Sequence, residues 1–307
     1  GSEMCIRDST LTPEQARKGP SVADAVTALM KKTDKKPEKV GNIDNRSIDG
    51  PVGKVKVRIY RPEGNGPFPV IVYFHGGGWV IADLDTYDAS PRALANAARA
   101  IVVSSHYRQA PEHKFPAAHE DALAAYRWTL ANAAELKGDP SRVAVAGESA
   151  GGNLAAAVCM MAREQGIRLP VHQLLIYPVA DTGMDTPSYR ENAEAKPLDK
   201  KGMEWFAKHA IPPDQKMNPL LKLVSAPDLK GLPPATIITA QIDPLRSEGA
   251  TFAEKLKAAG VPVSYRNFDG MTHEFFGMGA VVDKAKDAVK FAAEGLQSSF
   301  ATPTGRK

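Results

Sequence analysis

Short, almost wholly apolar runs recur along the chain and are separated by longer stretches with helical periodicity. The runs predict strands buried on both faces, because a half-exposed strand would alternate apolar and polar residues. They cover residues 70–74, 101–104, 143–146, 171–176, 235–240 and 261–267. The predicted helices cover residues 91–99, 117–134, 150–164, 247–259 and 282–297. This alternation predicts an α/β fold, with a mostly parallel central sheet and helices on both of its faces.

Three segments depart from this rhythm. Residues 12–32 are polar and helical in pattern, whereas residues 54–60 alternate apolar and charged residues and predict a half-exposed strand. More than fifty residues separate Tyr177 from Pro234, which is too long for a simple crossover. We expect this interval to hold a helical insert that covers the carboxyl edge of the sheet together with the N-terminal segment.

The chain therefore divides into a main domain and a smaller cap. The main domain comprises residues 51–181 and 226–300, the N-terminal cap segment residues 10–50, the inserted cap segment residues 182–225, and the tail residues 301–307. We exclude residues 1–9 from the analysis of the fold. Gly1-Ser2 resembles the scar of a cleaved tag, and the MCIRDS sequence that follows resembles translated sequencing-adapter DNA. A natural leader could have been lost here.

Composition narrows the function classes. Of 307 residues, 43% are hydrophobic and 24% charged, which is typical of a soluble globular protein. The net charge of +4 is small, its basic residues are scattered, and neither a nucleic-acid motif nor a membrane-spanning stretch is present. A disulfide between Cys5 and Cys159 is not expected. Since both cytoplasmic and periplasmic enzymes manage without disulfides, the compartment stays open.

A candidate nucleophile lies between a predicted strand and a predicted helix. Ser149 is the centre of Gly-Glu-Ser-Ala-Gly at residues 147–151. On such a sharp turn the hydroxyl points into a cleft, and flanking glycines permit the strained backbone. The pattern also occurs by chance in glycine-rich loops, but the strand before it and the helix after it favour a catalytic serine.

A serine hydroxyl needs a neighbouring base and an acid that orients the base. His273 follows the last predicted strand, and Asp243 follows the strand at residues 235–240. The order Ser149, Asp243, His273 is the nucleophile–acid–histidine order of an α/β-hydrolase. Asp243 could instead be a helix N-cap, and Asp269 is a rival acid on the loop of His273. The remaining histidines lack metal-ligand spacing, so no metal site is expected.

The run His-Gly-Gly-Gly-Trp at residues 75–79 follows another strand. Glycines let backbone N–H groups approach the oxyanion that forms during acyl transfer. We expect the donors to be Gly76, Gly77 and Ala150, while His75 holds the loop in place. Aromatic and apolar residues are candidates for the substrate pocket, although each also fits ordinary packing: Trp79, Tyr177, Met203, Trp205, Phe206 and Phe275.

Six motifs in this order resemble those of the hormone-sensitive-lipase family of bacterial carboxylesterases. Besides the glycine-rich and serine motifs, they are Tyr-Arg-Gln-Ala-Pro-Glu at residues 107–112, Phe-Pro-Ala-Ala at 115–118, Asp-Pro-Leu-Arg at 243–246 and His-Glu-Phe at 273–275. The resemblance runs from about Lys54 to the C-terminus. Glu148 departs from the Asp or Thr more usual in the family, and Gln109 from the usual Leu.

The resemblance implies an α/β-hydrolase catalytic domain with a helical cap, no cofactor, and a preference for short acyl chains. The expected activity is hydrolysis of short-chain or small aromatic carboxylic esters through an acyl-enzyme. Amide, carbamate or lactone hydrolysis remains an alternative on the same three residues. A non-catalytic receptor is disfavoured because His273 is retained. Some members of the family pair through edge strands or the last helix, which leaves a homodimer open.

Overall fold

The fold is described from a computed structural model, which describes residues 10–302. Its centre is an eight-stranded sheet in the order β1-β2-β4-β3-β5-β6-β7-β8. Strands β3 to β8 run parallel to one another, whereas β2 is antiparallel to both β1 and β4. The strands are β1 Asn42–Gly50, β2 Gly53–Arg61, β3 Phe68–Phe74, β4 Ile101–Ser105, β5 Gly138–Glu148, β6 Gln173–Ile176, β7 Ala235–Ile242 and β8 Val263–Thr272.

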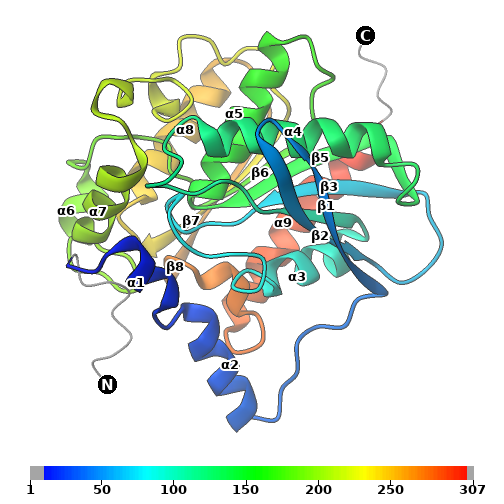
Figure 1. Cartoon of the computed structure of the whole chain (residues 1–307), viewed down its shortest axis with the longest axis horizontal. Helices are drawn as coiled ribbons and strands as arrows, with labels where there is room; N and C mark the ends of the chain where they lie inside the picture. The colour runs from blue at the N-terminus through cyan, green and yellow to red at the C-terminus, as the bar shows by residue number, and fades with distance from the viewer. Residues whose placement is uncertain (1–9, 303–307) are drawn as a thin grey trace.

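Helices cover both faces of the sheet (Figure 1). On one face lie α4 (Ala117–Asn132), α5 (Ala150–Glu164) and α8 (Arg246–Ala258), and their buried side chains share one apolar core. The other face is covered by α3 (Ala89–Ala98) and α9 (Asp283–Ala301), which form a second core. Alternate residues of the central strands point into the two cores, so the buried parts of these strands are largely apolar. The predicted fold class is confirmed.

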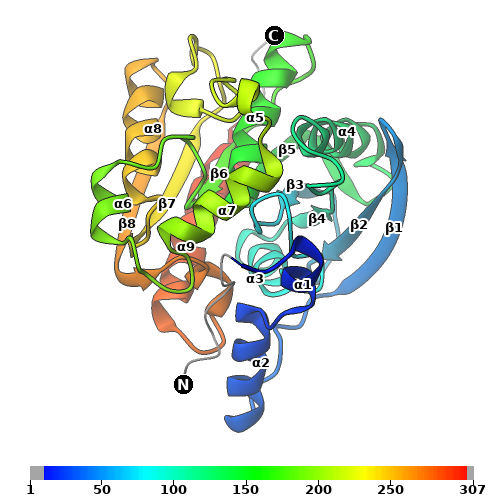
Figure 2. The same ribbon diagram turned by 60° about the vertical axis from the view of Figure 1, so that its left-hand side comes forward.

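The long interval after β6 contains α6 (Pro187–Glu191), α7 (Lys200–Ala210) and two short 3₁₀ turns, η1 (Pro213–Gln215) and η2 (Leu223–Ser225). A further 3₁₀ turn, η3 (Phe275–Met278), follows β8. The Trp205 indole on α7 donates a hydrogen bond to the carbonyl of Leu11, so the insert contacts the N-terminal segment. Figure 2 shows α7 and α1 in front of the central strands.

Two parts of the N-terminal region differ from the sequence prediction. The stretch expected to be helical over residues 12–32 forms two helices, α1 (Pro13–Lys18) and α2 (Val22–Lys32), because Gly19-Pro20 interrupts it and Ser21 caps the second. Strand β1 was missed and its residues were assigned to the cap segment. It is a polar edge strand that buries only Ile48, so its apolar signal is weak.

Predicted boundaries elsewhere differ from the observed ones by a few residues, chiefly in β5, which begins at Gly138, and β8, which ends at Thr272. Cys159 is buried in α5, while Cys5 and the expected tag or adapter residues 1–9 lie outside the described residues. Within residues 10–302, no helix combines the length and the apolarity that crossing a bilayer requires.

Candidate active site

Ser149 lies on a sharp turn between β5 and α5. Its backbone is strained, with φ 58° and ψ −119°, and its N–H donates to the carbonyl of Ile176 at 2.9 Å. The turn requires its glycines. A Cβ at Gly147 would lie 2.1 Å from the carbonyl oxygen of Gly151, and a Cβ at Gly151 would lie 2.0 Å from that of Phe74. The local sequence therefore forces the serine side chain out of the sheet edge.

Three side chains that are distant in sequence meet at this turn. His273, which follows β8, places Nε2 3.0 Å from Ser149 Oγ and Nδ1 2.7 Å from Asp243 Oδ2. Asp243 follows β7 and is fully buried, and its Oδ1 accepts a hydrogen bond from the backbone of Leu245 at 2.9 Å. All three lie where neighbouring parallel strands end, and this common edge brings them together.

The rival assignments of the acid differ in geometry. Asp269 lies in β8 and is exposed, and its Oδ1 accepts a hydrogen bond from Asn267 of the same strand and not from His273. Asp243 does not occupy the N-cap position of α8, which belongs to Leu245. Of the two carboxylates, only Asp243 contacts the imidazole.

The site holds His273 in an acidic environment. Burial lowers the pKa of His273, but the charge and hydrogen bond of Asp243 outweigh burial, with further support from the charges of Glu274 and Glu148. The pKa therefore lies above its ordinary value of 6.5. A raised pKa suits a base that takes a proton from a serine hydroxyl.

Glu148, immediately before Ser149, is a buried carboxyl group. Its Oε1 accepts a hydrogen bond from Tyr73 Oη at 2.6 Å, and its Oε2 accepts one from Tyr177. Burial and the neighbouring charge of Glu274 raise its pKa to about 7, although hydrogen bonds from surrounding hydroxyls oppose the shift. The ring of Tyr177 also packs on that of His273, with centroids 4.5 Å apart, so Glu148 is linked to the imidazole through one side chain.

The glycine-rich loop after β3 is held by polar contacts beneath it. Tyr107 Oη donates to the carbonyls of His75 and Gly76 at 2.9 and 3.0 Å, and His75 Nε2 lies 3.0 Å from His106 Nδ1. Gln109 donates to two further carbonyls of the following turn, at residues 81 and 82. His75 is fully buried, as expected of a residue that fixes the loop.

A cavity of about 40 Å³ adjoins Ser149 and His273. Since one water molecule needs roughly 10–15 Å³ of such a cavity, this cavity holds about three waters. Its walls come from the glycine-rich loop, the segment after β6, and α7 with its flanks. Besides Ser149 and His273, the cavity is lined by Gly77, Gly78, Trp79, Val179, Asp181, Thr182, Met184, Pro197, Leu198, Met203, Phe206, Ala207, Ile211 and Glu274.

Half of the expected pocket residues lie on this cavity, namely Trp79, Met203 and Phe206. The other three do not line it because they pack elsewhere. The hydroxyl of Tyr177 is bonded to Glu148, Trp205 turns its indole N–H to the carbonyl of Leu11, and Phe275 packs against Tyr177 and Phe268.

The three expected oxyanion donors lie differently relative to the cavity. Gly77 lines the cavity, whereas Gly76 and Ala150 do not. A Cβ on Gly76 would lie 2.3 Å from Tyr87 Oη, so this residue faces the loop interior. Gly78, which the sequence analysis omitted, lines the cavity with φ 58°, and a Cβ there would lie 2.2 Å from the ring of Phe206. The positive φ of Gly77 and Gly78 turns the loop after β3 towards Ser149.

Sequence reasoning also missed Glu274, whose Oε1 lies 3.9 Å from His273 Nε2. Its position next to the candidate histidine was the available signal, but a charged residue on a loop is ordinarily solvated. Within residues 10–302, no cluster of three or more His, Cys, Asp or Glu side chains is arranged to hold a metal ion.

Comparisons with known proteins agree with this geometry. Residues 71–277 match the model of a family described as having the alpha/beta hydrolase fold. The chain is 47% identical over 253 residues to carboxylesterase NlhH of Mycobacterium tuberculosis, covering 80% of this chain and 79% of that protein. It is 33% identical over 266 residues to ethyl acetate hydrolase of Pseudomonas putida, covering 85% and 83%. A crystal form of Pyrobaculum calidifontis esterase superposes with a TM-score of 0.89 at 36% identity, covering 96% of each chain.

Proposed function

Because the chain belongs to the hormone-sensitive-lipase type of the α/β-hydrolase family and is a carboxylic ester hydrolase, we propose that Ser149, His273 and Asp243 are its catalytic triad. The observation that carries the proposal is the continuous pair of hydrogen bonds from Ser149 Oγ through the imidazole to Asp243. A hydroxyl, a base and an orienting carboxylate in this order are what nucleophilic acyl transfer requires.

The reaction then has two halves. His273 Nε2 takes the proton of Ser149 as Oγ attacks the ester carbonyl, and the proton passes to the departing alcohol. Water next attacks the acyl-enzyme, gives a proton to the same nitrogen, and releases the acid. Asp243, bonded to Nδ1, keeps Nε2 free to face Ser149 and stabilises the imidazolium.

We assign the oxyanion donors to the N–H groups of Gly77, Gly78 and Ala150. Gly77 and Gly78 replace the pair Gly76 and Gly77 expected from the sequence, because Gly78 lines the cavity and Gly76 does not. Ala150 is retained because it is the first residue of α5, where N–H groups have no intrahelical acceptor. Loss of one such donor typically costs roughly 3 kcal/mol of transition-state stabilisation.

The small cavity supports a preference for short acyl groups. Its volume of about 40 Å³ suits an acetyl or propionyl chain, and Phe206 and Met203 of α7 close it on the side of the insert. We therefore regard residues 182–225 as a cap over the site, with α1 and α2 as its N-terminal part. Since β1 belongs to the sheet, that N-terminal part ends before Asn42. In a series of p-nitrophenyl esters, kcat/KM is expected to fall from butyrate to octanoate.

Substitutions of the triad test the proposal. We expect Ser149→Ala to lose about 10⁶-fold in kcat on p-nitrophenyl acetate, and Asp243→Asn about 10⁴-fold. Asp269→Asn is the matched control, because this carboxylate lies in β8, four residues before His273, and is bonded to Asn267 instead, so its kcat should stay near that of the wild type. Full activity in folded Ser149→Ala, or equal losses in the two aspartate variants, would contradict the assignment.

A further inference from the structure

Glu274 stands between the cavity at Ser149 and a second, larger space. A groove of about 1030 Å³ runs between α2, α3, η3 and α9, lined by residues such as Met30, Ala97 and Val289. Only two residues, Gly77 and Glu274, line both the groove and the small cavity within residues 10–302. Glu274 therefore lies at the border between the cavity at Ser149 and the groove.

The carboxylate of Glu274 is held in place. Its backbone adopts the left-handed conformation with φ 70°, which is unusual for a residue with a side chain. Its Oε1 accepts a hydrogen bond from Tyr87 Oη at 2.5 Å, and the side chain is 21% exposed. The same oxygen lies 3.9 Å from His273 Nε2, too far for a direct hydrogen bond.

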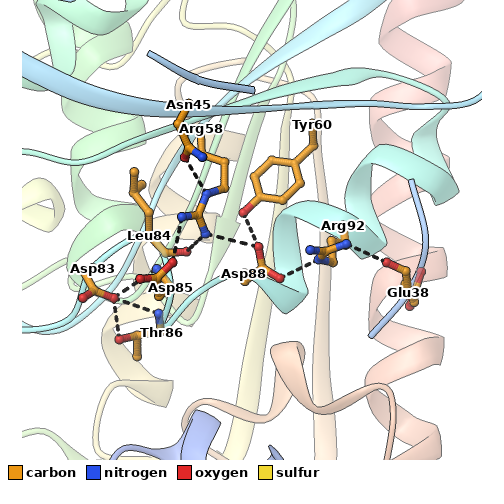
Figure 3. Close-up of polar contacts among 10 residues, drawn as sticks. All are labelled: Glu38, Asn45, Arg58, Tyr60, Asp83, Leu84, Asp85, Thr86, Asp88 and Arg92. Carbon is orange, nitrogen blue, oxygen red and sulfur yellow. Dashed lines mark hydrogen bonds and ion pairs between the residues drawn. The ribbon is translucent and has the colours of Figure 1, made fainter. Parts of the chain in front are cut away.

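The residues on either side of Tyr87, Thr86 and Asp88, belong to the network of polar contacts in Figure 3. Asp88 accepts hydrogen bonds from Tyr60 Oη at 2.7 Å and from Arg92 Nε at 2.5 Å. Asp85, on the same loop, accepts one from Arg58 at 2.7 Å. The loop that carries Tyr87 is thus tied to β2 and to α3, and the hydroxyl that holds Glu274 has a fixed place.

Hydrolysis of the acyl-enzyme requires a water molecule next to His273 Nε2. In the second half of the proposed reaction the acyl group fills the small cavity, so attacking water needs another approach to His273 Nε2. A water about 2.8 Å from each of Nε2 and Glu274 Oε1 bridges atoms 3.9 Å apart. Glu274 also lines the groove, which we take as the approach for this water.

We propose, resting on the triad proposed above, that Glu274 holds the hydrolytic water against His273 during deacylation. The water donates one hydrogen to Nε2 and the other to Glu274 Oε1. As its oxygen attacks the acyl carbon, the first proton moves to Nε2. The tetrahedral intermediate then collapses, the bond from carbon to Ser149 Oγ breaks, and Nε2 returns the proton to Oγ. Glu274 ends the step unchanged.

Water and methanol differ in the number of hydrogens that they can donate, and this difference tests the role of Glu274. Water has two hydrogens and can serve Nε2 and Glu274 at once, whereas methanol has one, which Nε2 requires. Glu274 therefore favours hydrolysis of the acyl-enzyme over its methanolysis. A residue that only preserved the fold, or only the charge of His273, would affect both reactions equally.

The test is the product ratio of methyl ester to free acid, formed from p-nitrophenyl acetate in aqueous methanol. The ratio does not depend on the fraction of active enzyme. Glu274→Met removes the acceptor at similar length, and we expect the ratio to rise about tenfold, as loss of a hydrogen bond to a charged group implies. Glu274→Gln keeps a neutral acceptor and should raise it less. Glu294→Gln is the control, since this glutamate lines the same groove away from His273.

An unchanged ratio in Glu274→Met, with the wild-type enzyme forming methyl ester, overturns the role of Glu274 and leaves the triad standing. Absence of methyl ester from the wild type, or activity in Ser149→Ala, would instead contradict the acyl-enzyme itself. Should the Glu274 variants fail to fold, Tyr87→Phe removes the hydroxyl that holds the carboxylate, and a smaller rise in the ratio is expected there. No rise in folded Tyr87→Phe would then overturn the proposal.

Discussion

Replacing Glu148 with glutamine is expected to change how stability depends on pH. The pKa of Glu148 is raised from 4.5 to about 7, chiefly because the group is buried. In the unfolded chain the carboxyl ionises near 4.5, whereas in the native protein it keeps its proton until about pH 7. Wild-type stability therefore includes a contribution that is complete below pH 4.5 and is lost as the pH rises through 7.

The magnitude follows from the difference between the two pKa values. A difference of about 2.5 units corresponds to about 3 kcal/mol, of which about 2–3 kcal/mol is lost between pH 5 and pH 9. Glu148→Gln has no such loss. Its amide nitrogen replaces an oxygen that accepts from a tyrosine, Tyr73 or Tyr177, and this mismatch costs about 1 kcal/mol at every pH.

Equilibrium unfolding in urea at pH 5, 7 and 9 measures the effect. The free energy of unfolding of Glu148→Gln, minus that of the wild type, should increase by about 2–3 kcal/mol from pH 5 to pH 9. The variant is thus expected to be the less stable protein in acid and the more stable one in base. Differences that stay constant with pH would refute the argument, because the buried carboxyl would then titrate alike in both states.

Three further changes have defined outcomes. Glu148 helps to raise the pKa of His273 only where it is ionised, from about pH 7 upwards, and Glu148→Gln removes that charge, so the acid limb of the kcat/KM profile should move to lower pH. An unmoved limb would exclude this coupling. Phe206→Ala enlarges the cavity, and the ratio of kcat/KM for octanoate to that for acetate should rise at least about tenfold, whereas a fixed ratio would mean that this ring does not limit the acyl chain. Asp88→Asn weakens the contacts with Tyr60 and Arg92, and the free energy of unfolding measured in urea should fall by about 2 kcal/mol. A change near zero would mean that the network does not stabilise the fold.

The sheet and most helices were predictable because their signals are local and strong. Strand β3 is apolar throughout and β5 is apolar over residues 143–147, and turn residues mark the ends of such runs. Strand β1 was not predictable in this way. It is held by backbone pairing with β2 along its whole length, and its largely exposed side chains carry little apolar pattern.

In the candidate site, too, the residues that follow strong strand signals were easier to predict than the others. Ser149, Asp243 and His273 were found because each follows a recognisable strand, and parallel strands bring their carboxyl ends to one edge. Pocket assignments were less accurate. Residue type alone does not distinguish Phe206, whose ring closes the cavity, from its neighbour Trp205, whose indole turns to the N-terminal segment.

Glu274 was missed because its position depends on contacts between residues that lie far apart in the sequence. Glu274 owes its place to Tyr87, which lies 187 residues earlier in the chain, and to its own left-handed backbone. Neither the hydrogen bond nor the conformation has a signature in the sequence.

Covalent labelling with an organophosphate tests the central claim most directly. After inactivation by diethyl p-nitrophenyl phosphate, the account predicts one phosphoryl group per chain, carried by the peptide that contains Ser149, with activity lost in proportion to labelling. Esterase activity that persists after complete labelling of Ser149, or inactivation through a different residue, would contradict it.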